Sequence, residues 1–359
     1  MKKTNTNTHE VIATSIKVKA KQIKLGIDVH KESYRVVRQV DNARPQPAQK
    51  YTPEAFLIWV RRQLEEAEEV HSCYEAGCFG YVLHRKLLAM GIKNLVIQPQ
   101  NWDERHKGVK TDKLDALAMV QRLDRYLAGN ERGLAIVRVP TEEEQLKRSE
   151  SRQREQILEH RKALEAQGRS LMLFNGVEVE GRWWKEAYWQ GLQERIQPKL
   201  LGLVEELRNL VLLLEARLQE ATKRLEEAAS PAPRGVGKLS SQILDREIVD
   251  WHRFTNRRQV ASMTGMCPQV HASGDKSISG SINKSGNRRV RTVLVELAWR
   301  CRKFQPDYPP LKRWRLLLAN PKTPGSQKKK AIVAIGRHLA IDLWRIKTGR
   351  ATAEELGLA

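Results

Sequence analysis

Residues 22–127 contain two neighbouring strand-like runs followed by alternating strand-like and helix-like segments. Gln22–Val29 and Ser33–Val40 alternate apolar and polar residues around a short polar turn, which predicts a β-hairpin. The later segments are predicted, in order, as helix Pro53–Glu66, strand Val70–Glu75, helix Gly80–Met90, strand Asn94–Ile97 and helix Lys113–Leu127. A hairpin continued by alternating strands and helices predicts a layered α/β domain.

Four acidic residues lie at strand ends and at a helix start, the positions where functional sites form in such a domain. Asp28 and Glu75 lie at predicted strand ends, and Asp112 and Asp115 begin the helix that follows. Taken alone, Asp112 and Asp115 are equally well explained as an N-cap and a first-turn acid. Carboxylates are the ligands that Mg²⁺ prefers, and two such ions can clamp a phosphodiester. The four acids together therefore favour a magnesium site.

The net charge of the chain is +22, with a sequence pI near 10.0. Such an excess of cations predicts a polyanionic partner, with binding that weakens as salt rises. A ribosome-like or membrane-surface basic protein is the alternative. No apolar run reaches membrane-spanning length, and residues 1–22 are expected to be a disordered polar tail rather than a signal peptide. The four cysteines lack CxxC spacing, so we expect reduced thiols in a cytoplasmic protein. We further expect the protein to be associated with the nucleoid and to have no membrane partner.

Residues 141–230 change to long charged helical patterns. Apolar residues recur at heptad-like spacing at Ile157, Leu164 and Leu171, and again from Val204 to Leu225. This pattern predicts a helical hairpin or coiled coil that holds a dimer or tetramer together, with an intramolecular bundle as the alternative. The Trp183–Trp184 pair between the two runs is interpreted as core, with base stacking as the alternative.

The last third of the chain contains a glycine turn and a serine-rich stretch. Arg234 and Lys238 flank a glycine turn before the predicted helix Leu239–Ile248, which suits either a phosphate contact or a simple turn. His271–Arg291 is rich in Ser and Gly and is expected to be a loop. A serine hydroxyl there can attack a phosphate polarised by the nearby cations Lys284, Arg288, Arg289 and Arg291.

The first half carries three motifs of a known family. GIDVHK, CYEAG followed by GYVLHRKLL, and KTDKLDA resemble the RuvC-like domain of the bridge-RNA-guided insertion-sequence transposases, relatives of the pilin-gene invertase. The resemblance implies a ribonuclease H-like fold whose DEDD site binds Mg²⁺ through Asp28, Glu75, Asp112 and Asp115. Lys110, which opens the third motif, is also expected to contact nucleic acid.

The second half resembles the C-terminal serine transposase domain of the same family. Its motifs correspond to Gly265–Pro268, Ala272–Lys276 and Ser281–Arg288. Ala272 replaces the first serine of the family pattern, so the family nucleophile falls on Ser273. Asp275 replaces its second glycine, and Ser277 and Ser279 are alternative nucleophiles. Lys276 is expected to contact nucleic acid, as Lys284 and Arg288 are.

The resemblance implies a DNA transposase or recombinase that cuts and rejoins donor and target DNA through a serine–DNA ester. It also implies a structured guide RNA, the bridge RNA, which would account for the absence of an obvious base-reading module. A pilin-type invertase, a metal-dependent structure-selective nuclease and a non-catalytic nucleic-acid-binding protein are the alternatives. The expected organisation is a tail (1–22), an α/β RuvC-like domain (23–140), a helical coiled-coil segment (141–230) and a mainly α transposase domain (231–359).

Overall fold

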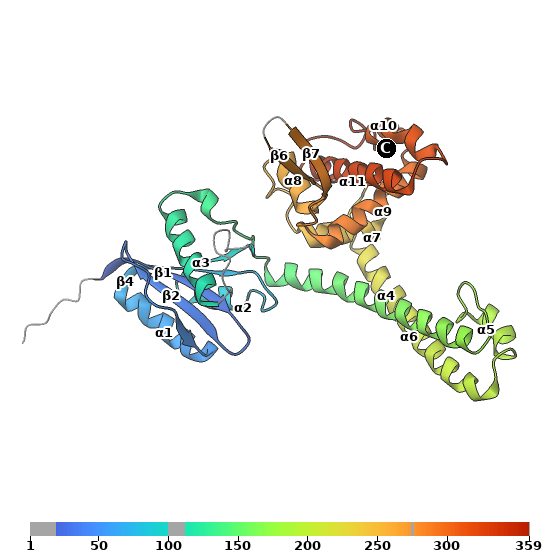
Figure 1. Ribbon diagram of the computed structural model, residues 1–359, viewed down its shortest axis with the longest axis horizontal. Coiled ribbons are helices and arrows are strands. Elements are labelled where there is room, and N and C mark those ends of the chain that lie inside the picture. The colour runs from blue at the N-terminus through green and yellow to red at the C-terminus, as the bar shows by residue number, and fades with distance from the viewer. Residues whose placement is uncertain (1–18, 100–111, 274–275, 359) are drawn as a thin grey trace, which may run out of the picture. The chain divides into compact units, whose positions relative to one another are not determined.

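The computed structural model describes residues 19–99, 112–273 and 276–358, and the chain divides into two compact units, 1–139 and 140–359 (Figure 1). The expected domain boundary after residue 140 lies one residue from this division. The expected segments 141–230 and 231–359 both belong to the second unit. Most of the expected N-terminal tail, Lys110 and Asp275 lie outside the described residues.

The first unit is built on a five-stranded sheet with strand order β3-β2-β1-β4-β5. The predicted hairpin is β1–β2, and β3 pairs antiparallel with β2. On the other side β4 pairs parallel with β1, and β5 pairs parallel with β4. The short strand β3 was not expected from the sequence. The strands are β1 Ala20–Val29, β2 Tyr34–Val40, β3 Gln49–Tyr51, β4 Ala67–Glu75 and β5 Lys93–Ile97.

Helices cover both faces of this sheet (Figure 1). Helices α1 (Pro53–Glu66) and α2 (Val82–Ala89) pack on one face, where they share a core with Ile23, Leu25 and Ile27 of β1. Alternate residues of a strand point to opposite faces, so Lys24, Gly26 and Asp28 face the other side. Helix α3 (Asp112–Leu127) lies there.

Helix α3 packs against β1 at very short range because residue 26 is glycine. A Cβ atom at Gly26 would lie 2.2 Å from the carbonyl oxygen of Ala116 and 2.7 Å from the amide nitrogen of Val120. Further back along β1, the buried Lys24 ammonium forms an ion pair with Asp124, near the end of α3. These two contacts show that α3 runs antiparallel to β1, with its first turn towards the end of the strand that carries Asp28.

Replacing Gly26 with alanine is expected to destabilise the first unit by about 3 kcal/mol, the upper end of the usual cost of overpacking, because the new methyl group meets helix backbone. Gly77→Ala is the matched control, since the nearest atom to its Cβ lies 4.0 Å away. Thermal unfolding of both variants measures the difference. Equal stability of the two variants would contradict the proposed close approach of α3.

A long helical hairpin begins the second unit (Figure 1). It is formed by α4 (Glu142–Phe174) and α6 (Pro198–Glu227), connected through the short α5 (Glu186–Gln193). Thr141 and Glu144 form a capping box at the start of α4. Helices α4 and α6 pack against each other within one chain, as the intramolecular alternative predicts.

The tryptophan pair lies in the core of this hairpin. Trp183 and Trp184 are buried, and their indole N–H groups donate to the Glu165 carbonyl at 3.1 Å and to Glu215 Oε2 at 3.0 Å. The core interpretation is therefore confirmed. Their rings and donors are already engaged inside the protein, so base stacking by this pair is wrong.

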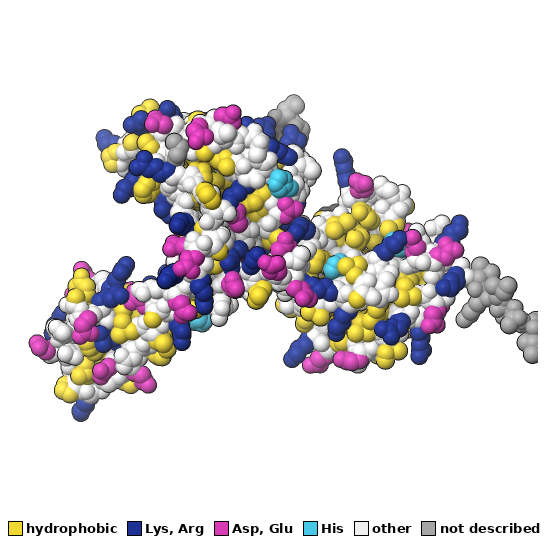
Figure 2. All heavy atoms as spheres, turned by 180° about the vertical axis from the view of Figure 1, so that it is seen from behind, with side chains coloured by type: hydrophobic (Ala, Val, Ile, Leu, Met, Phe, Trp, Pro, Cys, Tyr) yellow, Lys and Arg dark blue, Asp and Glu magenta, His cyan; other side chains and the backbone are white. Residues whose placement is uncertain are grey.

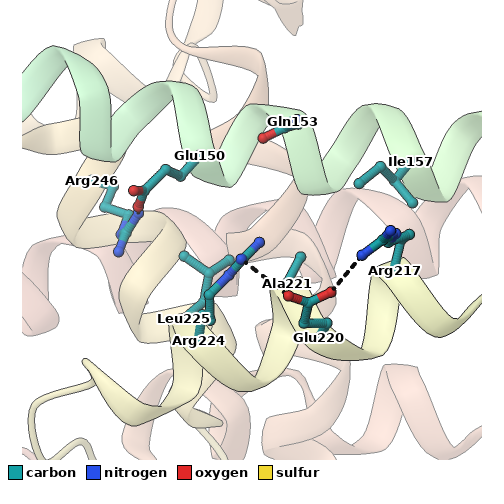
Figure 3. Close-up of a pocket in the computed structure, with 9 residues that line it drawn as sticks. All are labelled: Glu150, Gln153, Ile157, Arg217, Glu220, Ala221, Arg224, Leu225 and Arg246. Carbon is teal, nitrogen blue, oxygen red and sulfur yellow. Dashed lines mark hydrogen bonds and ion pairs between the residues drawn. The ribbon is translucent and has the colours of Figure 1, made fainter. Parts of the chain in front are cut away.

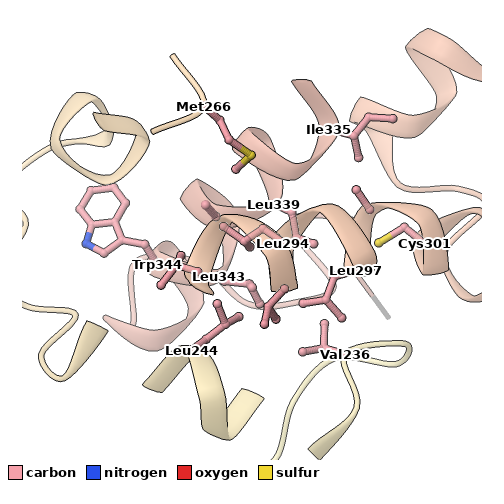
Figure 4. Packing of buried hydrophobic residues seen from close by; sticks show 14 of the residues in the cluster. Val236, Leu244, Met266, Leu294, Leu297, Cys301, Ile335, Leu339, Leu343 and Trp344 are labelled. Carbon is pink, nitrogen blue, oxygen red and sulfur yellow. The ribbon is translucent and has the colours of Figure 1, made fainter. Parts of the chain in front are cut away.

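A mainly helical body completes the second unit, with one small β-hairpin. Figure 4 shows its core, where side chains such as Leu294, Leu297, Ile335 and Leu339 pack together. Helix α10 was not expected from the sequence. Residues 251–254 were expected to belong to a helix, and this was wrong, because the helix begins only at Arg257 after the Asn256 cap. The elements are α7 Lys238–Ile248, α8 Arg257–Thr264, β6 Pro268–Ser273, β7 Lys276–Ile282, α9 Arg288–Phe304, α10 Pro309–Ala319 and α11 Gly325–Lys347.

The serine-rich stretch expected to be a loop is largely a β-hairpin. Strands β6 and β7 pair antiparallel, with Ser273 opposite Lys276 and Ala272 opposite Ser277. The loop expectation was therefore wrong for most of this stretch. Ser and Gly favour turns, but Val270, Ile278 and Ile282 are β-branched residues that favour strands.

The four cysteines are free thiols, as expected from their spacing. None of the helices in the described part of the chain is long and apolar enough to cross a membrane.

Candidate functional site

Asp28 and Glu75 are neighbours at the ends of two adjacent parallel strands. Ile27 of β1 lies opposite Tyr74 of β4, so the next residues along the two strands are Asp28 and Glu75. Neighbouring strands lie about 4.8 Å apart, and paired residues of parallel strands point to the same face. This face is the one that α3 covers, since the Cys73 thiol two residues before Glu75 contacts the Met119 carbonyl at 3.6 Å.

The first turn of α3 supplies the other two acids. A strand advances about 3.3 Å and a helix about 1.5 Å per residue, so the two-residue step from Gly26 to Asp28 corresponds to about four residues of the antiparallel helix. That step leads from the contacts at Ala116 and Val120 back to the start of α3, where Asp112 and Asp115 lie. One carboxylate oxygen of Asp115, Oδ1, is buried. The side chain of Asp112 is outside the described part of the chain.

The chemistry of this edge suits a hard divalent cation. All four acids are carboxylates, the donor type that Mg²⁺ takes in proteins. His30 Nε2 lies 3.1 Å from Oδ2 of Asp28 and helps to fix that carboxylate. Within residues 19–99, 112–273 and 276–358, no three His, Cys, Asp or Glu side chains are grouped closely enough to hold a metal ion. The donor set therefore fits Mg²⁺ in type, but the structure does not group Asp28, Glu75 and Asp115 closely enough to hold one ion.

The β6–β7 hairpin carries the expected nucleophile at its tip. Ser273 is the last residue of β6, and Lys276 is the first residue of β7. Ser277 and Ser279 lie further along β7, opposite Ala272 and Val270. The register therefore puts Ser273 nearer the tip than either alternative serine.

Two motif glycines hold the base of the hairpin. A Cβ atom at Gly286 would lie 2.2 Å from the amide nitrogen of Gly265, and Gly265 has a φ of +66° that favours glycine. The Lys284 amide donates to the Gly265 carbonyl at 3.1 Å, and the Asn283 amide donates to the Cys267 carbonyl at 2.9 Å. The segment after β7 is thus fastened directly to the end of α8.

Asn287 connects this segment to the helical hairpin. Its Oδ1 caps α9 by accepting from the amides of Arg289 and Val290, and its Nδ2 donates to Oε2 of Glu247 at 2.8 Å. Glu247 is fully buried, and its Oε1 accepts from Nε of Arg152 on α4 at 2.8 Å. Glu247 therefore joins α4, α7 and the start of α9.

The pKa of Glu247 reflects two opposing effects. Burial raises the pKa, but the hydrogen bonds from Arg152 and Asn287, together with the nearby charge of Arg148, outweigh burial and leave the pKa below its ordinary value. A depressed carboxylate pKa stabilises the fold above the unfolded-state pKa, and this stabilisation is lost as pH falls through the folded-state pKa.

Glu247→Gln is expected to lower the stability of the second unit by about 2 kcal/mol at neutral pH. This is less than the cost of breaking a fully buried pair, because the Arg152 side chain is 40% exposed. Glu150→Gln removes a more exposed partner of Arg246 and is expected to cost less than about 1 kcal/mol. Thermal unfolding at neutral and acidic pH gives the comparison. The difference between the two variants is expected to shrink in acid, and a difference that grows there contradicts this role for Glu247.

The basic residues expected to contact nucleic acid fall into three groups. Arg289 forms an ion pair with Glu155 and so braces the start of α9 against α4. Arg291 Nη1 donates to the Thr264 carbonyl at 3.0 Å and so braces the base of the β6–β7 hairpin. The side chains of Lys110 and Lys276 lie outside the described part of the chain. The side chains that remain exposed are those of Arg234, Lys238, Lys284 and Arg288. Figure 2 shows that Lys and Arg side chains occur over the surfaces of both units, with acidic side chains among them.

A charged cleft lies between α4 and α6 (Figure 3). Unlike the acidic edge and the β6–β7 hairpin, it is not a candidate site, because its charged side chains are paired with one another. Glu220 is paired with Arg217 and Arg224, each at 3.3 Å, and Glu150 is paired with Arg246 at 2.7 Å. Opposite charges along this cleft therefore neutralise each other and stabilise the base of the helical hairpin.

Comparison with known proteins identifies the family. Residues 233–311 match the family described as "Transposase IS116/IS110/IS902 family". The chain is 31% identical over 299 residues to y4rJ of Sinorhizobium fredii, assigned to the transposases, covering 76% of this chain and 75% of y4rJ. It is 24% identical over 313 residues to the transposase for insertion sequence element IS1533 of Leptospira borgpetersenii, covering 79% and 86% of the two chains.

A third relative, the transposase for insertion sequence element IS1111A of Coxiella burnetii, is 26% identical over 227 residues, covering 59% of this chain and 60% of the relative. Two of these relatives are named as transposases for insertion sequence elements, and the class of protein is therefore a DNA transposase. The chain belongs to the IS116/IS110/IS902 transposase family.

Proposed function

We propose that this transposase cuts and rejoins DNA with Ser273 as nucleophile, assisted by Mg²⁺ held by Asp28, Glu75, Asp112 and Asp115. The observation that carries the proposal is the side-by-side placement of Asp28 and Glu75 at the ends of β1 and β4, on the face covered by α3. The order of antiparallel and parallel strands supports a RuvC-like, ribonuclease H-like fold for the first unit.

The acidic edge has a defined part in this proposal. Bound Mg²⁺ would stabilise negative charge on the phosphodiester oxygens as it develops. Asp28 and Glu75 are held by the strands, Asp28 is oriented by His30, and Asp112 and Asp115 are delivered by α3. Rigid strand ends and a helix start keep such ligands in place before the substrate arrives.

The serine step conserves the number of phosphodiester bonds. The Ser273 oxygen bonds to a DNA phosphorus while the phosphorus–oxygen bond to the departing strand breaks, and the hydroxyl proton passes to the departing oxygen. Attack by a hydroxyl of another strand on the serine–DNA ester reverses the step and releases Ser273. The strands are therefore exchanged without an external energy source.

We also propose that a structured guide RNA, pairing with donor and target DNA, chooses the sites. The net charge of +22 supports a protein that binds nucleic-acid backbones and leaves sequence choice to base pairing. Such an enzyme works on chromosomal DNA in the nucleoid.

A covalent adduct tests the chemistry most sharply. The protein, its co-purifying RNA and Mg²⁺ are incubated with donor and target DNA, and protease-sensitive adducts are mapped by mass spectrometry. We expect the adduct on Ser273, its loss in Ser273→Ala and a weaker signal in Asp112→Ala. Ser277→Ala and Ser279→Ala are the matched controls and are expected to retain it.

The alternatives give different products in the same experiment. A metal-dependent nuclease would release free DNA ends without an adduct, and Ser273→Ala would leave cutting unchanged. An adduct that moves with Ser277 or Ser279 would keep serine chemistry but overturn the assignment of Ser273. A pilin-type invertase would use the same ester to invert a DNA segment rather than insert one.

We further propose that the helical hairpin holds two or more copies together. Helix α6 leaves Leu203, Leu210 and Leu213 exposed, two of them seven residues apart on one face. Exposed apolar residues at helical spacing are typical of a contact surface between chains.

The triple variant Leu203→Gln, Leu210→Gln, Leu213→Gln is expected to reduce the molar mass measured by light scattering to that of one chain. Leu146→Gln with Leu316→Gln removes leucines that are even more exposed but lie outside this surface, and is expected to leave the molar mass unchanged. A single-chain mass for the unaltered protein, or for both variants, would contradict association through this surface.

A further inference from the structure

A groove between α8 and α11 has a strongly cationic lining. It is lined by Arg257, Arg258, Arg337 and Arg345, with His338 beside them. Asp342 is the one carboxylate among the described residues of this lining. That carboxylate is already engaged, because the Tyr308 hydroxyl donates to its Oδ2 at 2.6 Å and Arg345 Nη1 lies 3.7 Å from its Oδ1. The groove therefore retains an excess of positive charge.

A second cavity continues the groove to the foot of the β6–β7 hairpin. It is bordered by residues 280–282 of β7 and, on α11, by Lys329, Lys330 and Arg337. Arg337 lines both cavities, so the two form one surface along α11. We call this surface the basic strip and define it by its cations Arg257, Arg258, Lys329, Lys330, Arg337 and Arg345.

The strip has the dimensions of a binding track. Its α11 members recur at helical spacing on one face, and Lys330 to Arg345 spans about 22 Å at the rise of an α-helix. That length matches several consecutive phosphates of a nucleic-acid strand. Val333 and Ile341 lie between the cations and offer apolar contact for sugars.

We propose that the basic strip binds the phosphodiester backbone of a nucleic-acid strand and leads that strand to the foot of the β6–β7 hairpin. The proposal rests on the proposed function only in taking nucleic acid as the ligand. Arginine forks bind phosphate oxygens in pairs, whereas no group of the strip is arranged to distinguish one base from another. Binding at the strip is therefore independent of base sequence. Ser273 belongs to the hairpin that the strip approaches.

The test uses full-length protein with Ser273→Ala, so that binding is measured without strand cleavage. The variant Arg257→Gln, Arg258→Gln removes two exposed cations from the first turn of α8, where their loss does not weaken the helix. Arg302→Gln, Lys303→Gln removes a matched exposed pair from α9, outside the strip. Fluorescence anisotropy is recorded over a range of salt concentrations with a DNA duplex of arbitrary sequence, its single strand and the RNA of the same sequence.

We expect the α8 variant to bind at least one of these probes about 10-fold more weakly. The slope of log affinity against log salt concentration is expected to fall by the equivalent of about one to two phosphate contacts. The α9 variant is expected to bind within about 2-fold of the parent protein. A greater loss on DNA assigns the strip to the substrate, and a greater loss on RNA assigns it to the guide. Equal losses in both variants, or no loss in the α8 variant, overturns the proposal.

This outcome is separate from that of the adduct experiment. An adduct on Ser273 together with unchanged binding by the α8 variant would contradict the role of the basic strip and support the proposed serine chemistry. Weakened binding by the α8 variant, without any adduct in the protein that retains Ser273, would contradict the serine chemistry and support the role of the basic strip.

Discussion

The close contact between β1 and α3 is the constraint on which the candidate metal site depends. Glycine at position 26 lets the helix backbone approach the strand, and the buried Lys24–Asp124 ion pair fixes the direction in which the helix runs. The first turn of α3 is thereby brought towards Asp28. A helix displaced by the width of one methyl group would move its acids relative to Asp28 and Glu75, and metal ligation tolerates only small displacements.

A different contact organises the second unit. Glu247 is buried where α4, α7 and the start of α9 meet, and it binds Arg152 and Asn287 at once. Because Asn287 also caps α9, the position of the segment after β7 depends on the same carboxylate. The helical hairpin and the β6–β7 hairpin are therefore connected through one hydrogen-bonded group. A movement of either hairpin would therefore displace the hydrogen-bonded groups at the base of the other.

The sequence predicted the elements of the first unit well because their signals are local. Helix α1 was predicted with its observed bounds from its apolar spacing, whereas the β6–β7 hairpin was expected to be a loop because its serines and glycines favour turns. The adjacency of Asp28 and Glu75 depends on strand register, which no local pattern specifies. The burial of Glu247 and the close approach at Gly26 depend on residues far apart in the chain, so neither was predicted, although a glycine within an apolar strand is a recognised signal of close packing.

The most direct test of the account is iron-mediated cleavage of the protein chain. Fe²⁺ replaces Mg²⁺ at carboxylate sites, and with ascorbate and peroxide it cuts the backbone near its ligands, so mass spectrometry of the fragments reports which segments share one ion. We predict cuts near residues 28, 75 and 112–115 together, all suppressed by excess Mg²⁺ and by Asp28→Asn. Cuts at only one of these segments, or cuts that persist in Asp28→Asn, would contradict a shared metal site at the ends of β1 and β4.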